Sequence, residues 1–531
     1  MNRRLLRANS FFQLLLILGI VIGINALGNR YFKRLDLTGD RIHSLSSPAK
    51  TLMKRLERPL TVKVFFTGDL EAPYNNHERL LVEKLQEFQA WANGRMSIEV
   101  IDPSEEVVEV IDGKEKTRTR EEEALRLGVM PHQYQYRDRT RSELRQVYMG
   151  AAFLYGEQQQ IMPVIVQLNG LEYDIARAIK RLIDPKPKRI GYSTGNGEVE
   201  LATDTRAPIQ ALRNQMVADN KELVPVDLDG KADQFKDLDA LLVVGPTSPL
   251  SRLSAFRLDQ YLMAGGSVAY LLSNYQPNTE TAEAQRIYHG LDDQLGAYGI
   301  RHNGDLVLDR QSNSKMPLPV RRGSTVQMVP VNTPAIPIVG HLSEESPIVR
   351  GIPKLTMPFV SSLDLPADDI PEREYRVLAK TGAEASRSQA VRRIDPYTLK
   401  ERGPGESIGE SAVLVDARGV FSSAFMNAEA PDPGEGEPEE IVVRESAPAR
   451  LVVAGTSHFM ANNVSAMMNL VDWMVADASL VDIRSKSVQV ASIDPMEAGE
   501  VQFWKLINLL GPVVLLLSIG GLMRVRRRWV S

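Results

Sequence analysis

Residues 239–272 read DALLVVGPTSPLSRLSAFRLDQYLMAGGSVAYLL, and this stretch decides the fold of the larger part of the chain. Residues 239–244 and 267–272 are continuous apolar runs, which are typical of strands buried on both faces of a parallel sheet. Residues 255–263 between them predict a helix, and Gly265 with Gly266 would end it. Buried strands that alternate with helices indicate an α/β fold with a doubly wound parallel sheet.

The same alternation begins upstream of this stretch. A Pro-Lys-Pro-Lys sequence at residues 185–188 marks a domain boundary. After it the sequence predicts a strand at residues 189–193, then a loop, and then a helix near residues 209–217. Far downstream, residues 450–454 (RLVVA) predict a further strand, which we expect to rejoin this sheet. We therefore place a second α/β domain at residues 188–480.

An irregular insertion is expected inside this second domain, at about residues 315–444. Periodicity weakens there, and Pro, Gly, Ser and Glu accumulate. Residues 428–440 (AEAPDPGEGEPEE) are acidic and poor in apolar side chains, which predicts a flexible loop.

A separate α/β domain is predicted at residues 31–184. Its expected elements are a strand at 60–66, a helix at 78–91, a strand at 96–101, a short helix at 121–127, a hairpin of strands 147–155 and 160–167, and a helix at 171–183. This order is that of a thioredoxin-like fold. The chain has no cysteine, so the fold would serve as a scaffold without a Cys-x-x-Cys motif.

Two apolar stretches near the ends of the chain predict membrane helices at residues 11–28 and 504–523. Each approaches the roughly 20 residues that a helix needs to cross a bilayer core. Arginines lie on the outer side of both, which indicates cytoplasmic tails at residues 1–10 and 524–531 and an extracytoplasmic body. Residues 481–503 would be a membrane-proximal linker. The alternatives are a cleaved signal peptide for the first stretch and a buried core helix for the second.

Composition excludes several classes of function. Hydrophobic residues make up 43% and charged residues 24% of the 531 residues, as in globular proteins, and the net charge of −4 supplies no field that would hold nucleic acid. Without cysteine there can be no disulfide, thiolate nucleophile or iron–sulfur cluster. Gly113-Lys114 and Gly230-Lys231 lack the rest of a phosphate-binding loop, so the chain is not an ATPase.

Ser457 and His458 superficially resemble a serine nucleophile elbow, because they follow a predicted strand and Gly455. The closing glycine is replaced by Phe459, and adjacent side chains rarely face each other as a nucleophile and its base must. A capping role for the serine and a buried histidine are the favoured interpretations. The seven histidines show no metal-ligand spacing, and Asp292 with Asp293 is expected on a solvated surface. We predict no catalytic residue, no metal site and no cofactor.

A ligand site is predicted in the loop formed by Thr194, Gly195, Asn196, Gly197 and Glu198. The loop follows a buried strand and precedes a helix, which is where open α/β sheets bind ligands. Its glycines permit close backbone approach to a polar ligand, and Glu198 can accept hydrogen bonds from hydroxyl groups. The alternative is that Gly and Asn only supply the backbone angles of a tight turn.

The order of these segments resembles the auxiliary extracytoplasmic component of bacterial ABC transporters, a family typified by the gliding-motility protein GldG. The resemblance rests on LDLTGDRIHSLSSPAKTLMKRLERPLTVKVFF at 35–66, LEYDIARAIKRL at 171–182, IGYSTGNGE at 190–198 with LDQYLMAGGSVAYLL at 258–272, and VVAGTSHFMANN at 452–463 with NLVDWMVADASLVDIRSK at 469–486. It implies a second domain similar to the flavodoxin or class I glutamine-amidotransferase fold without a catalytic cysteine. The family's GHGE-like loop has Asn196 in place of histidine, and its GDSDF-like segment has lost both acidic positions at Thr456 to Phe459.

The resemblance implies a noncatalytic subunit at the bacterial inner membrane, whose body either binds a ligand or transmits conformational change. Its partners would be the permease and ATPase subunits of an ABC transporter, and its ligand a polar molecule or a glycan. Two other classes remain open: an extracytoplasmic enzyme that modifies envelope polymers, and a structural envelope scaffold.

Overall fold

The computed structural model of the chain describes residues 45–475 and residue 483, apart from residues 69, 73, 112–113, 138–141, 169, 279–280, 323–324, 369, 390, 392, 435–437 and 439. The chain divides into two compact units, residues 1–487 and 488–531, and every described residue belongs to the first unit. The membrane helices, the cytoplasmic tails and nearly all of the linker predicted from the sequence lie outside the described residues. No helix within the described residues has the length and apolarity needed to cross a bilayer.

The first sheet has four strands in the order β2-β1-β7-β8. Strands β1 (Leu60–Phe66) and β2 (Met96–Ile101) are parallel and are joined by the helix α3 (His77–Gln89). Strands β7 (Met149–Tyr155) and β8 (Gln158–Met162) form the antiparallel hairpin that completes the sheet. The hairpin's second strand begins earlier than predicted and ends before Pro163, which has no backbone N–H to continue the ladder.

The two faces of the first sheet are covered differently. Helices α2 (Ser47–Lys54), α3 and α5 (Leu171–Ile183) contribute to one apolar core, together with alternate strand residues such as Val64. The other face carries Phe65 and packs against the short helix α4 (Glu121–Arg126).

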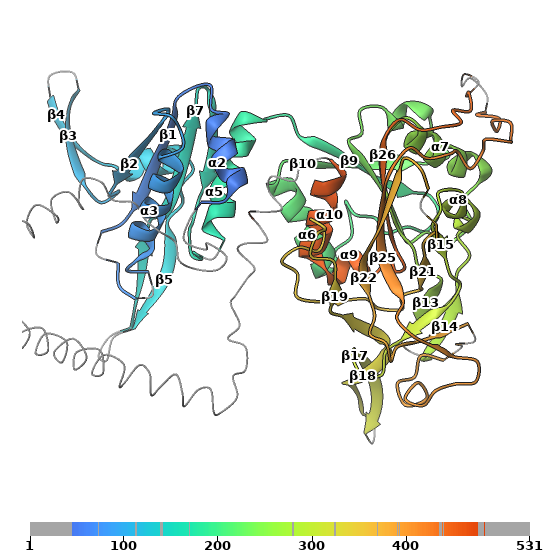
Figure 1. Ribbon diagram of the computed structural model, residues 1–531. Helices are drawn as coiled ribbons and strands as arrows, with labels where there is room; N and C mark the ends of the chain where they lie inside the picture. Colours follow the sequence, from blue (N-terminus) through green and yellow to red (C-terminus); the bar gives the residue numbers. More distant parts are fainter. Residues whose placement is uncertain are drawn as a thin grey trace, which may run out of the picture. The chain divides into compact units, whose positions relative to one another are not determined.

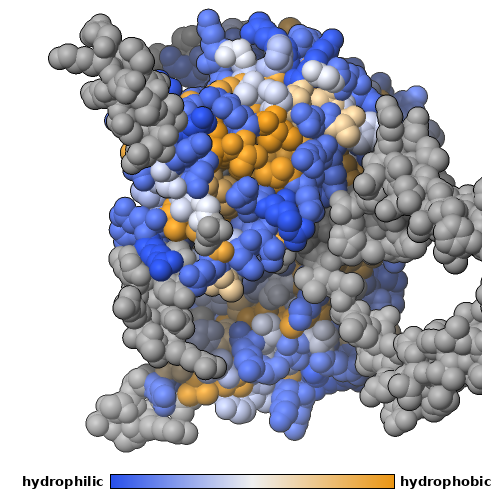
Figure 2. All heavy atoms as spheres, turned by 90° about the vertical axis from the view of Figure 1, so that its left-hand side faces the viewer, coloured by the Kyte–Doolittle hydropathy of each residue, from blue (hydrophilic) through white to orange (hydrophobic). Residues whose placement is uncertain are grey.

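Apolar side chains are also exposed in this part of the chain. Figure 2 shows them gathered on one face and surrounded by polar residues. The exposed apolar residues here include Val100 in β2, Leu125 in α4 and Met130 in the segment after α4.

Two hairpins in this region have no counterpart in the sequence prediction. They are formed by β3 (Glu106–Ile111) with β4 (Lys114–Thr119) and by β5 (His132–Arg137) with β6 (Ser142–Val147). Strand β4 reads KEKTRT and has no apolar residue, so no periodic signal marks it. Pairing with β3 defines this strand.

The second sheet is larger and mixed, with the strand order β10-β9-β11-β12-β26-β25-β21-β15 (Figure 1). The first five of these strands are parallel neighbours, so the strand predicted at 450–454 does rejoin the sheet. Strands β25 and β26 are antiparallel. The elements of this core are β9 (Lys188–Thr194), α6 (Ala207–Ala218), β10 (Lys221–Asp227), a 3-10 turn (Ala232–Phe235), β11 (Ala240–Val244), α7 (Arg252–Met263), β12 (Ser267–Leu271), α8 (Asp292–Ala297), β15 (Arg301–His302), β21 (Leu363–Asp364), β25 (Ala412–Gly419), β26 (Ala449–Ala454), α9 (Phe459–Asn462) and α10 (Val464–Met474).

Helices cover both faces of the second sheet. Every residue of β11 and β12 is buried, and alternate residues of β11 belong to different cores. Leu242 and Val244 pack with α6, α9 and α10, whereas Leu241 and Val243 pack with α7 and α8. Figure 1 shows these two groups of helices on opposite sides of the strands. Burial on both faces explains the continuous apolar runs in the sequence.

The expectation of an irregular insertion at about 315–444 has to be corrected, because this region forms strands. Strand β25 lies within the main sheet, and β17 with β18 forms a long hairpin. The other bounds are β13 (Tyr275–Asn278), β14 (Glu283–Arg286), β16 (Leu306–Leu308), β17 (Asn313–Arg322), β18 (Thr325–Val339), β19 (His341–Leu342), β20 (Leu355–Thr356), β22 (Arg373–Lys380), β23 (Ser386–Ser388) and β24 (Ser407–Ile408).

The end of the acidic segment predicted as a flexible loop is held against α7. Glu440 forms an ion pair of 3.0 Å with Arg257, whose side chain is only 2% exposed. Asp259 on the same helix is buried and accepts hydrogen bonds from the Ser423 hydroxyl and the Ala424 amide. The segment between β25 and β26 therefore contacts α7 near its start, at Ser423 and Ala424, and near its end, at Glu440.

Candidate ligand site at the carboxyl edge of the second sheet

The strand order of the second sheet creates a switch point between β9 and β11. The parallel strands of this sheet, numbered in chain order from 1 to 5, are β9, β10, β11, β12 and β26. In the sheet they lie in the order 2-1-3-4-5. The helix after β9 packs on one face of the sheet and the helix after β11 packs on the other. Ligands of open α/β sheets bind where neighbouring strands diverge in this way, at their carboxyl ends. The loop predicted to bind a ligand lies at this position.

The loop after β9 is tied to the loop after β11 by hydrogen bonds. The Asn196 carbonyl accepts from the backbone amides of Thr247 at 2.9 Å and Ser248 at 3.2 Å. It also accepts from the Ser248 hydroxyl at 3.2 Å. Within the first loop, the Asn196 amide donates to Glu198 Oε2 at 2.6 Å. The two loops that border the switch point therefore act as one rigid unit.

The two glycines of this loop differ in the space that a side chain would have. Both have positive φ, +107° at Gly195 and +80° at Gly197. A Cβ at Gly197 would lie 2.1 Å from Thr247 Oγ1, whereas at Gly195 its nearest neighbour would be Asp227 Oδ1 at 3.6 Å. A side chain at Gly197 would therefore require Thr247 to shift, in accordance with the tight-turn alternative.

Glu198 has one side-chain oxygen that makes no hydrogen bond with the described residues. Its Oε2 accepts the Asn196 amide, but its Oε1 is enclosed and has no hydrogen-bond partner among the described residues. Thr194, the last residue of β9, is half-buried. Ligand binding by Thr194, Gly195, Asn196, Gly197 and Glu198 remains a prediction.

Ser457 and His458 are arranged as structural residues. The Ser457 hydroxyl lies 2.9 Å from the Ser273 hydroxyl, and the Ser457 amide donates to Ser273 Oγ at 2.8 Å. The His458 ring instead lies edge-on to Phe359, with centroids 5.8 Å apart. Burial and the nearby charge of Arg206 lower the pKa of His458. The described contacts thus pair Ser457 with Ser273 and the His458 ring with Phe359.

The turn after β26 is shaped by Thr456, where the sequence analysis favoured Ser457 as the capping residue. Thr456 Oγ1 donates to the Pro358 carbonyl at 2.6 Å and accepts from the His458 amide at 3.2 Å. The hydroxyl of Ser457 is directed to the end of β12 instead. No sequence signal separates these roles in a Gly-Thr-Ser-His run.

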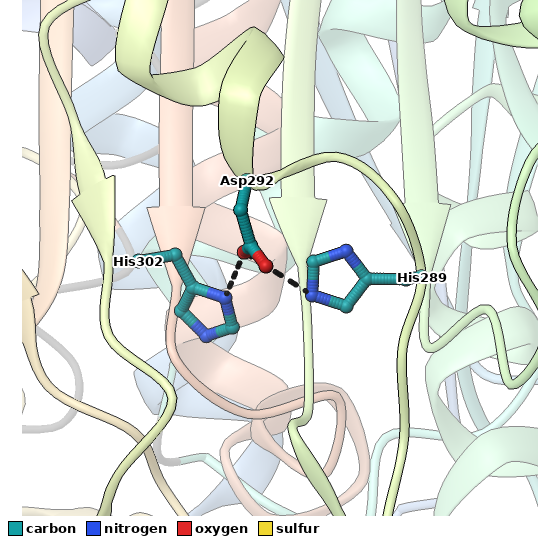
Figure 3. A group of neighbouring side chains, drawn as sticks. All are labelled: His289, Asp292 and His302. Atoms are coloured by element: carbon teal, nitrogen blue, oxygen red, sulfur yellow. Dashed lines mark hydrogen bonds and ion pairs between the residues drawn. The ribbon is translucent and has the colours of Figure 1, made fainter.

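The structure brings together three side chains that the sequence analysis did not connect: His289, Asp292 and His302 (Figure 3). His302 Nδ1 lies 3.2 Å from Asp292 Oδ1, and His289 Nε2 lies 3.7 Å from the same oxygen. The two histidine side chains are fully buried, whereas that of Asp292 is 42% exposed. In Figure 3 the imidazoles approach the carboxylate from either side, and Asp292 projects from the start of α8.

Local structure explains how these residues meet. Gly290, with φ of +75°, turns the chain between His289 and α8. His302 returns on β15, which pairs with β21 in the main sheet. The expectation that Asp292 belongs to a freely solvated acidic pair has to be corrected, since its carboxylate is held between two buried imidazoles. Asp293 is exposed, as expected.

The charges of this cluster are set by burial. Burial and the neighbouring His302 lower the pKa of His289 to about 4, so its ring is neutral at pH 7. Burial works against ionisation of Asp292, but the hydrogen bond with His302 and the nearby histidine and Arg286 charges lower its pKa below the ordinary value. The cluster therefore presents a carboxylate beside a neutral imidazole.

This cluster adjoins the carboxyl edge of the second sheet. The His289 carbonyl accepts from the amide of Leu250 in the loop between β11 and α7, at 3.2 Å. The Asn274 amide group, just after β12, lies 3.4 Å from the His302 ring nitrogens. Asn274 directly follows Ser273, which contacts Ser457. The edge is thus lined by hydroxyl and amide groups that lead to the His–Asp–His cluster.

Comparison with known protein families gives two matches that together cover most of the chain. Residues 187–478 match a family described as an ABC-type uncharacterized transport system, under the family name ABC_transp_aux. Residues 39–154 match a domain of unknown function, DUF7088. The first match covers the whole of the second sheet and its helices.

Comparison with individual proteins gives more distant similarities. An uncharacterized protein of Borreliella burgdorferi is 22% identical over 252 residues, which are 47% of this chain and 48% of that protein. The chain thus spans about half the length of the curated relative that it matches.

Among solved structures, the mmIFT52 N-terminal domain is 17% identical with a TM-score of 0.31, and covers 54% of this chain and 97% of its own. A putative ThuA-like protein from Bacteroides uniformis is 12% identical with a TM-score of 0.28, and covers 54% and 92%.

Proposed function

Since the chain belongs to the family of auxiliary components of ABC-type transport systems, we propose that it is a noncatalytic subunit of a bacterial ABC transport complex. Its partners in this proposal are a permease in the membrane and an ATPase on the cytoplasmic side. The observation that carries the proposal is the family match over residues 187–478, because it includes every strand of the second sheet.

The proposed kinship is with the gliding-motility type of auxiliary component. The four sequence segments that resemble this type include strands of both sheets and the helix α5, and they extend beyond the described residues. We also propose a thioredoxin-like first domain, which is supported by the order β2-β1-β7-β8 with one parallel and two antiparallel pairs. A second domain of flavodoxin or glutamine-amidotransferase type is supported by the 2-1-3-4-5 order.

The proposed arrangement in the cell follows from the two apolar end segments. Membrane helices at residues 11–28 and 504–523 would leave both termini in the cytoplasm and the body outside the inner membrane. In that position the body can meet the outer face of a permease, and it can do so without contributing to ATP hydrolysis.

The proposed ligand position is the carboxyl edge of the second sheet, at Thr194 to Glu198. Its support is the switch point between β9 and β11 and the enclosed Glu198 Oε1, which has no hydrogen-bond donor among the described residues. A polar molecule or a glycan offers such donors. The pairing of Ser457 with Ser273 favours a binding role over the hydrolysis of envelope polymers.

The proposal is tested by purifying the full-length chain, with a C-terminal tag, from membranes in mild detergent after cross-linking. We expect a permease and an ATPase to co-purify, and we expect ATP hydrolysis in the purified complex. A matched control is Glu198→Gln, which changes the proposed ligand position and should leave the captured partners unchanged.

A second variant separates membrane association from capture through the body. A chain without residues 504–531 should lose most of the permease, because one of the two proposed anchors is missing. Purification of the intact chain without any ATPase or permease, under conditions that preserve other ABC complexes of the same membrane, would refute the assignment.

A further inference from the structure

The cluster of His289, Asp292 and His302 contains an unsatisfied buried group. His289 Nε2 is inaccessible to solvent and has no hydrogen-bond partner among the described residues. The nearest charged oxygen, Asp292 Oδ1, is 3.7 Å away, which is beyond hydrogen-bonding distance. Buried polar atoms are nearly always paired, so a nitrogen in this position calls for a ligand.

The spacing of the three donor atoms matches that around a small metal ion. Zinc lies about 2.0–2.2 Å from nitrogen and carboxylate oxygen ligands, so tetrahedral neighbours are roughly 3.3–3.5 Å apart. Here the two nitrogen-to-oxygen distances are 3.2 and 3.7 Å, and all donor atoms lie within 4.8 Å of one another. We propose that His289, Asp292 and His302 bind one divalent transition-metal ion of the zinc type.

The donor set selects this class of ion. Two imidazoles and one carboxylate suit Zn²⁺ and its first-row neighbours, whereas Ca²⁺ and Mg²⁺ require six or more oxygen ligands. Both rings bind a metal ion in their neutral form. Asp292 supplies a negative charge that neutralises part of the charge of the ion.

Binding requires one local rearrangement at each histidine. The hydrogen bond from His302 Nδ1 to Asp292 Oδ1 at 3.2 Å places the proton of the neutral His302 ring on Nδ1, so this proton has to move to Nε2 before Nδ1 can bind the metal. The Leu291 amide donates to His289 Nδ1 at 3.2 Å, so the neutral ring carries its proton on Nε2. When the metal binds Nε2, this proton has to move to Nδ1, and the Leu291 amide loses its acceptor. Both rings stay neutral throughout, and each exchanges one hydrogen bond for a metal–nitrogen bond.

The position of the cluster provides both an entrance and a free coordination place. Asp292 is 42% exposed, so an ion can reach the buried imidazoles along its carboxylate. Three protein ligands leave a fourth position for water or for a donor atom of a bound molecule. The cluster adjoins the β11–α7 loop and the end of β12 through Leu250 and Asn274. A metal here would join the start of α8 and β15 to the carboxyl edge of the second sheet.

The test is direct metal binding to the full-length chain, purified with a tag that contains no histidine and stripped with a chelator. Titration with Zn²⁺, followed by calorimetry and elemental analysis, should give one ion per chain and a higher melting temperature. Co²⁺ should replace Zn²⁺ and give a visible absorption spectrum of four-coordinate nitrogen and oxygen ligation. Ca²⁺ and Mg²⁺ should not compete.

The variants Asp292→Asn and His289→Ala should weaken Zn²⁺ binding by about tenfold or more, since each removes a direct ligand. Asp293→Asn is the matched control, because this neighbouring carboxylate is exposed, and His341→Ala removes an exposed histidine. Both controls should bind as the wild type does. Circular dichroism identifies any variant that fails to fold. If His289→Ala does not fold, the Zn²⁺ affinity of Asp292→Asn, which changes a half-exposed side chain, tests the proposed site.

The inference is overturned if the wild-type chain binds no Zn²⁺ or Co²⁺, or if Asp292→Asn binds as tightly as Asp293→Asn. It does not rest on the proposed transport function, because the readout is metal content and affinity. A chain that binds zinc but captures no ABC subunit would refute the function and leave the metal site standing.

Discussion

Among single residues, Gly197 has the least space for a side chain at the predicted ligand loop. A Cβ would lie 2.1 Å from Thr247 Oγ1, and the backbone φ is +80°. Gly405 provides a matched comparison, since it has the same φ of +80° but no atom within 4 Å of an added Cβ. The two positions therefore separate backbone strain from steric contact.

We predict that Gly197→Ala lowers the free energy of unfolding more than Gly405→Ala does. The backbone cost common to both is about 1–2 kcal/mol. The contact with Thr247 adds about 1–3 kcal/mol at Gly197, because either loop must shift. Chemical denaturation of both variants measures the difference. Equal losses would show that the β9 and β11 loops are not packed as described.

Asp416 predicts a pH dependence of stability. It lies in β25, is buried, and burial raises its pKa to about 6 despite the opposing charges of Arg376 and Arg418. Between the ordinary carboxyl value of 3.8 and about pH 6, the folded state holds a proton that the unfolded state has released. Stability contributed by this group therefore falls as the pH rises through that window, and stays low above it.

We predict that Asp416→Asn removes this decline and stabilises the protein at pH 7 by about 1–3 kcal/mol. Denaturation of wild type and variant at several values between pH 4 and pH 7 gives the comparison. Glu345→Gln, which replaces an exposed carboxylate, should follow the wild type. A constant difference between wild type and Asp416→Asn across this range would contradict the assignment to Asp416.

The predictability of the candidate sites depends on how local their residues are. The loop at Thr194 to Glu198 is contiguous and follows a recognisable buried strand, so its position at the sheet edge could be predicted. The bonds from Thr247 and Ser248 could not, because they depend on the neighbouring loop. His302 is brought to His289 only by the pairing of β15 with β21, and no local pattern encodes this pairing.

At the scale of elements, α7 begins with a side-chain cap that also links the helix to the turn after β10. Ser251 Oγ accepts from the Ser254 amide at 3.0 Å and donates to Asp229 Oδ1. We predict that Ser251→Ala lowers the free energy of unfolding by about 1 kcal/mol. Ser465→Ala, on the exposed face of α10, should have little effect. Thermal and chemical denaturation provide the measurement, and an unchanged Ser251→Ala would show that the cap is dispensable.

The elements that the sequence predicted are those with a strong local apolar pattern. Strands β11 and β12 are buried on both faces, so continuous apolar runs mark them. Strand β10 reads KELVPVD and lies at the sheet edge, where Pro225 and charged residues are tolerated. Strand β25 sits between segments rich in Gly and Ser, and only pairing with β26 and β22 reveals it. Nonlocal pairing thus accounts for the missed elements.

At the scale of the whole molecule, the proposed membrane localisation can be tested by removing the two apolar end segments. We predict that the full-length chain remains in membranes washed with alkaline carbonate, and that a chain without residues 1–30 and 504–531 is released. Chains that lack one segment should stay bound. Reporter fusions should place both termini in the cytoplasm. An intact chain that washes off, or termini on opposite faces, would refute this topology.

The position of β26 in the sheet has a consequence for biosynthesis. Strand β26 lies between β12 and β25, although residues 272–448 separate it from β12 along the chain. While the ribosome is still making that interval, β12 has an open edge with unpaired backbone groups. Closure requires contacts of high sequence separation, which form slowly. We therefore expect the nascent chain to need shielding by chaperones until Arg450–Ala454 has emerged, and chains truncated before this strand to aggregate.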